Sequence, residues 1–168
     1  MNNSELTEVK KAQRRLASIK RLHEGFMLPE SEIASYLDSG MPYLELKKIC
    51  LCGYITKKPV AEIIEMRKMY IWTRVLYLLG LSAEKLVVEE KLYKAERLER
   101  LYGFDKALVL HYMDLGFASH QIKRAYYISQ HCDKPMLEIL EMKTRLQKWP
   151  DIAESLGLSR DCCFGEKK

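Results

Sequence analysis

Residues 62–82 read EIIEMRKMYIWTRVLYLLGLS, and residues 138–159 read EILEMKTRLQKWPDIAESLGLS. When Gly40 is aligned with Gly116, the two halves of the chain match at a spacing of 76 residues, which becomes 77 after a one-residue insertion near Trp72. The identical pairs include Tyr36/Tyr112, Asp38/Asp114, Lys58/Lys134, Pro59/Pro135, Ile63/Ile139, Met66/Met142 and Trp72/Trp149. Because so many matches fall in one order, the sequence predicts an internal repeat.

Glycines mark the predicted helix ends in both halves. A glycine just after a helix adopts the left-handed conformation at little cost, and a following apolar residue packs back on the last turn. Six glycines precede a large apolar residue in this way and are predicted helix terminators: Gly25, Gly40, Gly80, Gly103, Gly116 and Gly157. Pro59, Pro135 and Pro150 mark predicted helix starts, because proline fits the first turn of a helix.

Apolar residues spaced three and four apart favour helices throughout the chain. Each half therefore divides into one longer amphipathic helix and four shorter ones. The predicted helices are 5–24, 29–39, 42–54, 59–70 and 73–79 in the first half, then 84–102, 105–115, 119–131, 135–147 and 150–156 in the second. The predicted fold is all-α, with two tandem tetrahelical, helix-turn-helix-like repeats, each preceded by a longer amphipathic helix. The predicted domains are residues 1–83 and 84–168.

The composition is that of an ordinary soluble globular protein, with 48% hydrophobic and 30% charged residues. We expect no secretory signal, since residues 1–15 contain no apolar segment. The longest apolar run, Val75–Leu81, is too short to cross a bilayer. The five cysteines form no disulfide framework and are interpreted as small hydrophobic thiols. These features predict a cytoplasmic protein that does not enter a membrane.

Residues 149–159, WPDIAESLGLS, resemble the first half of a bacterial helix-turn-helix motif. The resemblance implies that a recognition helix would follow Ser159, but only RDCCFGEKK remains there. In the first half, Leu76 takes the place of the motif's small Ala, and the following helix carries Glu84 and Glu89, which phosphates would repel. Both halves also resemble tetrahelical repeats of uncharacterised bacterial proteins, a resemblance that implies no activity.

No catalytic motif, phosphate-binding glycine loop or metal-ligand spacing is present, so we expect no enzyme, no cofactor and no metal site. Trp72 and Trp149 match across the halves and are predicted core anchors. The sequence favours a non-catalytic binding or adaptor module whose partner is another protein or a second copy. One surface for a second copy is an apolar stripe at seven-residue spacing on the first helix: Val9, Ala12, Leu16, Ile19, His23 and Phe26.

The alternative is a nucleic-acid-binding regulatory protein of the helix-turn-helix type. The net charge is +5, and much of the basic excess lies in the first helix. Basic side chains neutralise backbone phosphates, so a cluster of them predicts polyanion binding. The candidate contacts are Lys10, Lys11, Arg14, Arg15 and Arg160.

Overall fold

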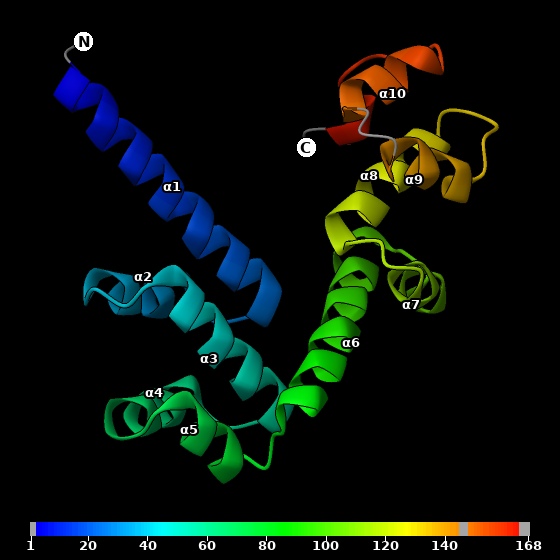
Figure 1. Ribbon diagram of the computed structural model, residues 1–168. Coiled ribbons are helices and arrows are strands. Elements are labelled where there is room, and N and C mark those ends of the chain that lie inside the picture. Colours follow the sequence, from blue (N-terminus) through cyan, green and yellow to red (C-terminus); the bar gives the residue numbers. More distant parts are fainter. Residues whose placement is uncertain (1–2, 145–147, 165–168) are drawn as a thin grey trace. The chain divides into compact units, whose positions relative to one another are not determined.

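The computed structural model describes residues 3–144 and 148–164, which form ten α-helices, one short 3-10 helix and no strand (Figure 1). The prediction of an all-α fold is therefore confirmed. The chain divides into two compact units between Glu90 and Lys91. This division falls inside a helix, seven residues after the predicted boundary between residues 83 and 84.

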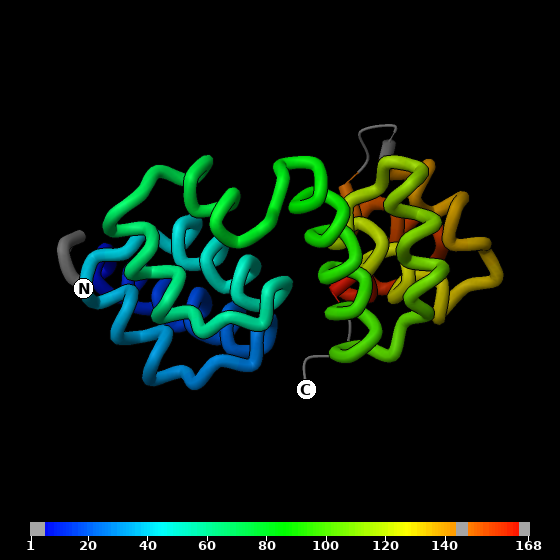
Figure 2. Tube along the Cα trace, turned by 90° about the horizontal axis from the view of Figure 1, so that it is seen from below, coloured from blue at the N-terminus to red at the C-terminus, as the bar shows by residue number. Residues whose placement is uncertain are grey.

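The first unit is built around a central helix. Its helices are α1 (Asn3–Phe26), α2 (Glu30–Asp38), α3 (Tyr43–Thr56), α4 (Val60–Met69) and α5 (Trp72–Leu78). Helix α3 lies between the pair α1 and α2 on one side and the pair α4 and α5 on the other (Figures 1 and 2). All five helices supply core side chains, among them Ile19, Ile33, Leu46, Ile49, Ile63 and Val75. Burial of this apolar surface stabilises the unit.

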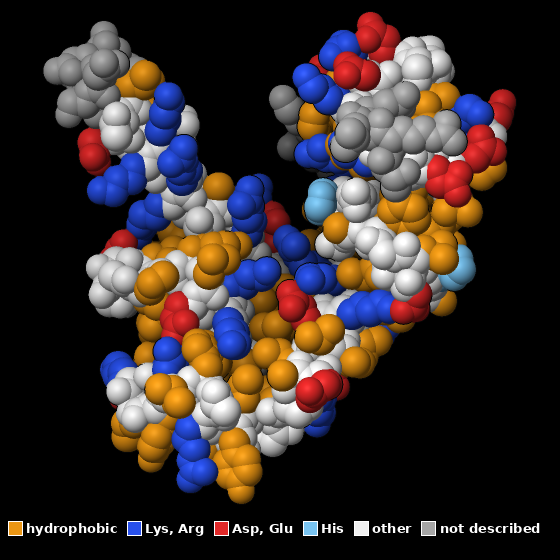
Figure 3. Space-filling view, viewed as in Figure 1, with side chains coloured by type: hydrophobic (Ala, Val, Ile, Leu, Met, Phe, Trp, Pro, Cys, Tyr) orange, Lys and Arg blue, Asp and Glu red, His pale blue; other side chains and the backbone are white. Residues whose placement is uncertain are grey.

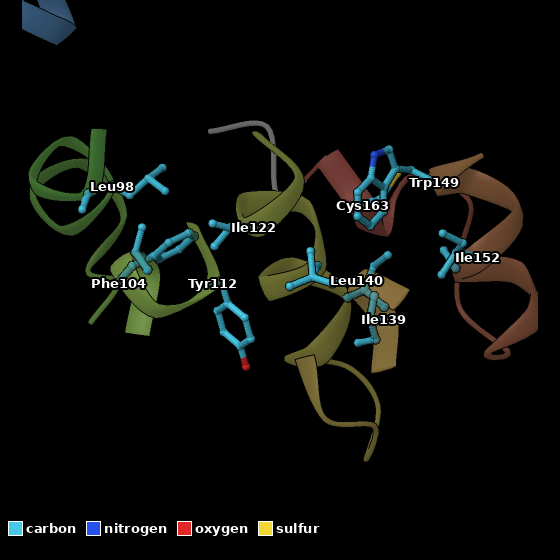
Figure 4. Packing of buried hydrophobic residues seen from close by; sticks show 14 residues of the cluster. Leu98, Phe104, Tyr112, Ile122, Ile139, Leu140, Trp149, Ile152 and Cys163 are labelled. Carbon is cyan, nitrogen blue, oxygen red and sulfur yellow. The ribbon is translucent and has the colours of Figure 1, made fainter. Parts of the chain in front are cut away.

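The second unit is built around α8. Helix α6 (Ala83–Tyr102) begins in the first unit and is followed by α7 (Lys106–Asp114), α8 (Ser119–Ser129), α9 (Met136–Thr144), α10 (Trp149–Ser155) and the 3-10 helix η1 (Cys162–Phe164). Helix α8 packs against α7, α9 and η1. Figure 4 shows the core between these elements, which includes Leu98, Phe104, Ile122, Ile139, Trp149 and Ile152.

The helices of the two units begin at a constant spacing. Helices α7, α8 and α9 begin 76 residues after α2, α3 and α4, and α10 begins 77 residues after α5. The spacing changes at the loop before α5, since Ile71 and Lys148 are the N-caps of α5 and α10. Two residues are called counterparts when they lie 76 residues apart up to α4, or 77 apart from Ile71 on. Buried residues fall on counterparts such as Ile63 and Ile139.

Five of the predicted terminators have the backbone conformation that favours glycine. The φ angles are +89° at Gly40, +67° at Gly80, +71° at Gly103, +92° at Gly116 and +73° at Gly157. At Gly40, Gly80, Gly116 and Gly157 the residue after the glycine closes the turn, as when the Leu81 N–H donates to the Leu76 carbonyl at 2.9 Å. This 6→1 bond satisfies a carbonyl that the helix end would otherwise leave unpaired.

The prediction that Gly25 terminates the first helix is wrong. Gly25 is buried inside α1, which ends at Phe26, and Met27 takes the left-handed conformation with φ +62°. Met27 is the counterpart of Gly103, and both N–H groups bond four residues back at 2.8 Å, to His23 and Glu99. Helix α1 ends at Phe26, 76 residues before the end of α6 at Tyr102. The pair Gly25-Phe26 lies 78 residues before Gly103-Phe104 and does not mark the helix end.

Replacing Met27 with Gly is expected to raise the free energy of unfolding of the first unit by about 0.5–1 kcal/mol. Met27 is 72% exposed, so little packing is lost, and an L side chain is strained at this φ. The reverse change, Gly103→Met, is expected to destabilise the second unit by a similar amount, although nothing lies within 4 Å of an added Cβ. Urea denaturation of the two variants tests this, and a destabilising Met27→Gly change would contradict it.

Candidate interaction site

Helix α5, the loop before it and the last residue of α4 expose large apolar side chains to solvent. The exposed fractions are 66% for Met69, 42% for Tyr70, 73% for Ile71, 72% for Tyr77 and 41% for Leu78. These five residues are called the α5 face. In Figure 3, hydrophobic side chains gather over α4 and α5. A continuous exposed apolar surface is typical of a site that contacts another molecule.

The counterpart helix α10 carries polar residues at the same outward positions. Ile71, Arg74, Tyr77 and Leu78 correspond to Lys148, Asp151, Glu154 and Ser155. The inward position is apolar in both units, because Val75 and Ile152 are each 0% exposed. The fold thus requires an apolar residue at the inward position but none at the outward ones.

A groove of about 580 Å³ lies beside α5 in the first unit. One wall comes from α3 through Lys48, another from α5 through Trp72 and Leu76, and a third from the turn between α5 and α6. The complete lining is Lys48, Trp72, Thr73, Leu76, Tyr77, Gly80, Leu81, Ser82 and Ala83. Tyr77 belongs to both the groove and the α5 face, so the two form one surface.

The Trp72 ring in this groove is held by polar and cationic neighbours. Its indole N–H donates to Glu45 Oε2 at 3.0 Å, while Arg67 Nε donates to Glu45 Oε1 at 2.7 Å. Lys48 Nζ lies 4.0 Å from the ring centroid, and the Arg67 guanidinium carbon lies 4.8 Å from it. Cations over an aromatic face are attracted to it, so these contacts fix the orientation of the indole.

The Glu45 carboxylate has a lowered pKa. Burial raises its pKa, but the hydrogen bonds from Trp72 and Arg67 and the positive charges of Arg67 and Lys48 outweigh burial and lower it overall. The carboxylate therefore stays ionised at neutral pH and accepts both hydrogen bonds.

Replacing Glu45 with Gln is expected to remove a pH-dependent part of the stability of the first unit. Because the folded pKa lies below the unfolded one, the carboxylate stabilises the fold above its unfolded pKa of about 4.3. This stabilisation is lost as the pH falls through the lower, folded pKa. The wild type should therefore be the more stable protein at pH 7, and the difference should shrink at pH 3. Urea curves at both pH values test this, and a difference that does not change with pH would contradict it.

The two tryptophans differ in burial. Trp149 is 4% exposed and lies in the core of the second unit (Figure 4). Trp72 packs against the core of the first unit but is only half-buried, and it also lines the groove. Trp72 thus has a second, solvent-facing side that Trp149 lacks, and the anchoring role of both residues stays a prediction.

Two of the five predicted polyanion contacts are paired with carboxylates. Arg15 donates to both carboxylate oxygens of Asp38, at 2.9 and 2.7 Å. Arg160 belongs to the second unit and donates to Asp151 and Glu154 at 2.8 and 2.5 Å. Lys10, Lys11 and Arg14 are exposed on α1. The acidic partners neutralise two of the five positive charges.

The predicted apolar stripe of α1 is only partly buried. Ile19 is 5% exposed and packs in the first unit, whereas Val9 is 44% and Leu16 is 62% exposed. Within the stripe, Ile19 and Phe26 thus pack on the first unit, whereas Val9, Ala12 and Leu16 present their side chains to solvent. Pairing of this stripe with a second copy stays a prediction.

The cysteines of α3 are buried thiols. Burial raises the pKa of Cys50 to about 12 and that of Cys52 to about 11. Both are therefore uncharged at neutral pH and pack in the core of the first unit. Within the part of the chain that the structure describes, no three His, Cys, Asp or Glu side chains form a group that could hold a metal ion.

Comparisons with protein families, curated proteins and solved structures found no match to this chain. None of the described helices has the length and apolar character needed to cross a membrane. The function proposed for the chain consequently rests on its own surfaces.

Sequence reasoning did not single out the α5 face. A signal was present in the alignment of the two halves, where Tyr77 falls opposite Glu154 and Leu78 opposite Ser155. Such differences at positions that the fold leaves outside indicate a surface that one half carries and the other does not.

Proposed function

We propose that the chain is a tandem pair of one helical repeat and acts as a non-catalytic protein-interaction module. The repeat is supported by the equal spacing of helix starts and by ion pairs at counterpart positions. Arg15 pairs with Asp38 and Lys91 with Asp114, while Lys58 pairs with Glu62 and Lys134 with Glu138. Surface ion pairs contribute little stability each, so their recurrence supports a common origin of the two units.

The contact surface of this module is the α5 face together with the groove beside Trp72. The observation that carries the proposal is the exposure of Ile71 and Tyr77, 73% and 72%, where the counterparts are Lys148 and Glu154. Aromatic side chains at the centre of an interface supply much of the binding free energy, and polar surroundings exclude water from them. Tyr77 is an exposed aromatic side chain, and the guanidinium carbon of Arg74 lies 5.1 Å from its ring centroid.

A face-swap variant tests the proposal. It combines Ile71→Lys, Arg74→Asp, Tyr77→Glu and Leu78→Ser, and so places the outward residues of α10 on α5. We expect an unchanged helical circular-dichroism spectrum, because all four positions are exposed. Tagged wild-type chain and variant are purified from the same cells, and the co-purifying proteins are measured by quantitative mass spectrometry. The partner should fall about tenfold or more in the variant. Equal recovery with both chains would contradict the proposal.

Nucleic-acid binding is the second candidate, and the exposed cations Lys10, Lys11 and Arg14 on α1 favour it. Fluorescence anisotropy with labelled duplex and single-stranded DNA, at low and near-physiological salt, distinguishes the two functions. A nucleic-acid binder should lose affinity steeply with salt and should weaken when Lys10, Lys11, Arg14 and Arg15 become Ala. The interaction module should show no binding at near-physiological salt, and the face swap should not alter this result.

A further inference from the structure

In the second unit, the short helix η1 covers the wall formed by α8 and α10. Cys163 of η1 is 0% exposed and lies beside Trp149 in the core (Figure 4). The next side chain, Phe164, has its ring centroid 5.2 Å from the Arg124 guanidinium carbon of α8. A small buried residue and an aromatic residue over a cation together seat η1 on this wall.

The corresponding wall of the first unit is formed by α3 and α5, and no short helix like η1 follows it. A serine follows both walls and accepts a backbone hydrogen bond, but the spacing differs: Ser82 Oγ accepts from the Lys85 N–H at 3.1 Å, and Ser159 Oγ accepts from the Asp161 N–H at 3.4 Å. After Ser82, however, the chain continues as the long helix α6. Leu86, the counterpart of Cys163, packs partly against the core of the first unit, whereas Val87, the counterpart of Phe164, is 69% exposed and so covers little of this wall.

The wall formed by α3 and α5 has the same kinds of residue as the wall formed by α8 and α10. Lys48 corresponds to Arg124, so a cation stands in both places. Trp72 corresponds to Trp149, and Leu81 to Leu158. Lys48, Trp72 and Leu81 all line the groove of about 580 Å³. The groove therefore offers a cation like the one over Phe164, beside the counterparts of two apolar residues of the second unit.

We propose that the groove beside Trp72 binds a short segment of a partner protein in which a small apolar residue precedes an aromatic one. The small residue packs against the Trp72 indole, and the aromatic ring lies over the Lys48 ammonium, as Phe164 lies over Arg124. An acidic residue just before this pair suits the cations Lys48 and Arg74. This inference rests on the proposed function and names the chemistry of the partner.

A peptide with the sequence of residues 159–164, Ser-Arg-Asp-Cys-Cys-Phe, is a direct probe of the groove. It is acetylated and amidated, kept reduced, and titrated into the ¹⁵N-labelled full chain. The chain contains two tryptophans, one in each unit, so the two indole N–H signals report on the two walls separately. The variant Trp72→Phe lacks one of the two indole N–H signals, and the missing signal is thereby assigned to Trp72. The tethered η1 outcompetes free peptide in the second unit, so only the Trp72 signal should shift, and its shift should saturate.

Two controls make the result specific to the groove. Replacing the peptide's Phe with Ala, or Lys48 of the chain with Glu, should weaken binding about tenfold or more. The matched charge change Lys10→Glu on α1 should leave it unchanged. No shift of the Trp72 signal at millimolar peptide, or equal binding of the Phe→Ala peptide, would overturn the inference. A Trp72 signal that moves with chain concentration alone would also overturn it, since the occupant would then be a second copy.

The two proposals fail separately. If the peptide does not bind but the face swap still removes a partner, the interaction module stands and its partner has another chemistry. If the peptide binds but the face swap leaves every co-purifying protein in place, the groove is a peptide site and the α5 face is not the contact surface.

Discussion

Replacing Ile63 with Ala is expected to lower the free energy of unfolding of the first unit by about 2–5 kcal/mol. Ile63 is 0% exposed and belongs to the core cluster that also contains Leu46 and Val75. Its loss removes buried apolar surface and leaves a cavity that close-packed neighbours fill only in part. Ile139→Ala is expected to have the same effect on the second unit, because Ile139 is also 0% exposed.

Urea denaturation followed by NMR measures both effects, since the Trp72 and Trp149 indole signals report on the first and second unit. Glu65→Ala is the matched control on the exposed side of α4, and it should change stability by no more than about 0.5 kcal/mol. A cost below about 1 kcal/mol for both isoleucine variants would show that α4 and α9 do not close the two cores.

The second large loss of stability is expected where η1 packs in the second unit. Cys163→Asp places a carboxylate in a core position that is 0% exposed, and should destabilise the second unit by more than about 3 kcal/mol. Leu86→Asp changes the counterpart position on α6, which packs only partly against the first unit, and should cost about 1 kcal/mol. The same denaturation experiment compares them.

Cys163→Ser is the control that separates charge from shape, because it keeps the size of the side chain and adds no charge. It should cost less than half of the Cys163→Asp effect. Equal costs for Cys163→Asp and Leu86→Asp would contradict the difference in cover between the two walls.

The helix pattern of this chain was readable because the two halves share turn chemistry. Pro59 and Pro135 stand directly before α4 and α9, and Gly80 and Gly157 stand two residues after the last residues of α5 and α10. Proline and glycine act through local backbone geometry, so their effect does not depend on tertiary contacts. The prediction at Gly25 is wrong because it follows the match of Gly25-Phe26 to Gly103-Phe104, which departs from the constant spacing of 76 residues.

The α5 face was not predicted because residue type does not reveal which side of a short helix is buried. The apolar segment Tyr70–Leu79 is compatible with a buried helix, and only the structure shows that Tyr77 and Leu78 face solvent while Val75 is buried. The groove also depends on the course of the chain after Ser82, where the long helix α6 follows, whereas the short helix η1 follows Ser159 in the second unit. Such a difference follows from tertiary packing.

The most direct test of a dedicated contact surface in the first unit is photo-cross-linking at counterpart positions. Benzoylphenylalanine is placed at Tyr77 in one chain and at Glu154 in another, both positions being exposed, and each chain is irradiated in its own cells. We expect a discrete protein adduct from position 77. This adduct should be lost when Ile71→Lys and Leu78→Ser are added, and position 154 should give no such adduct. Adducts of equal yield from both positions, or none from position 77, would contradict it.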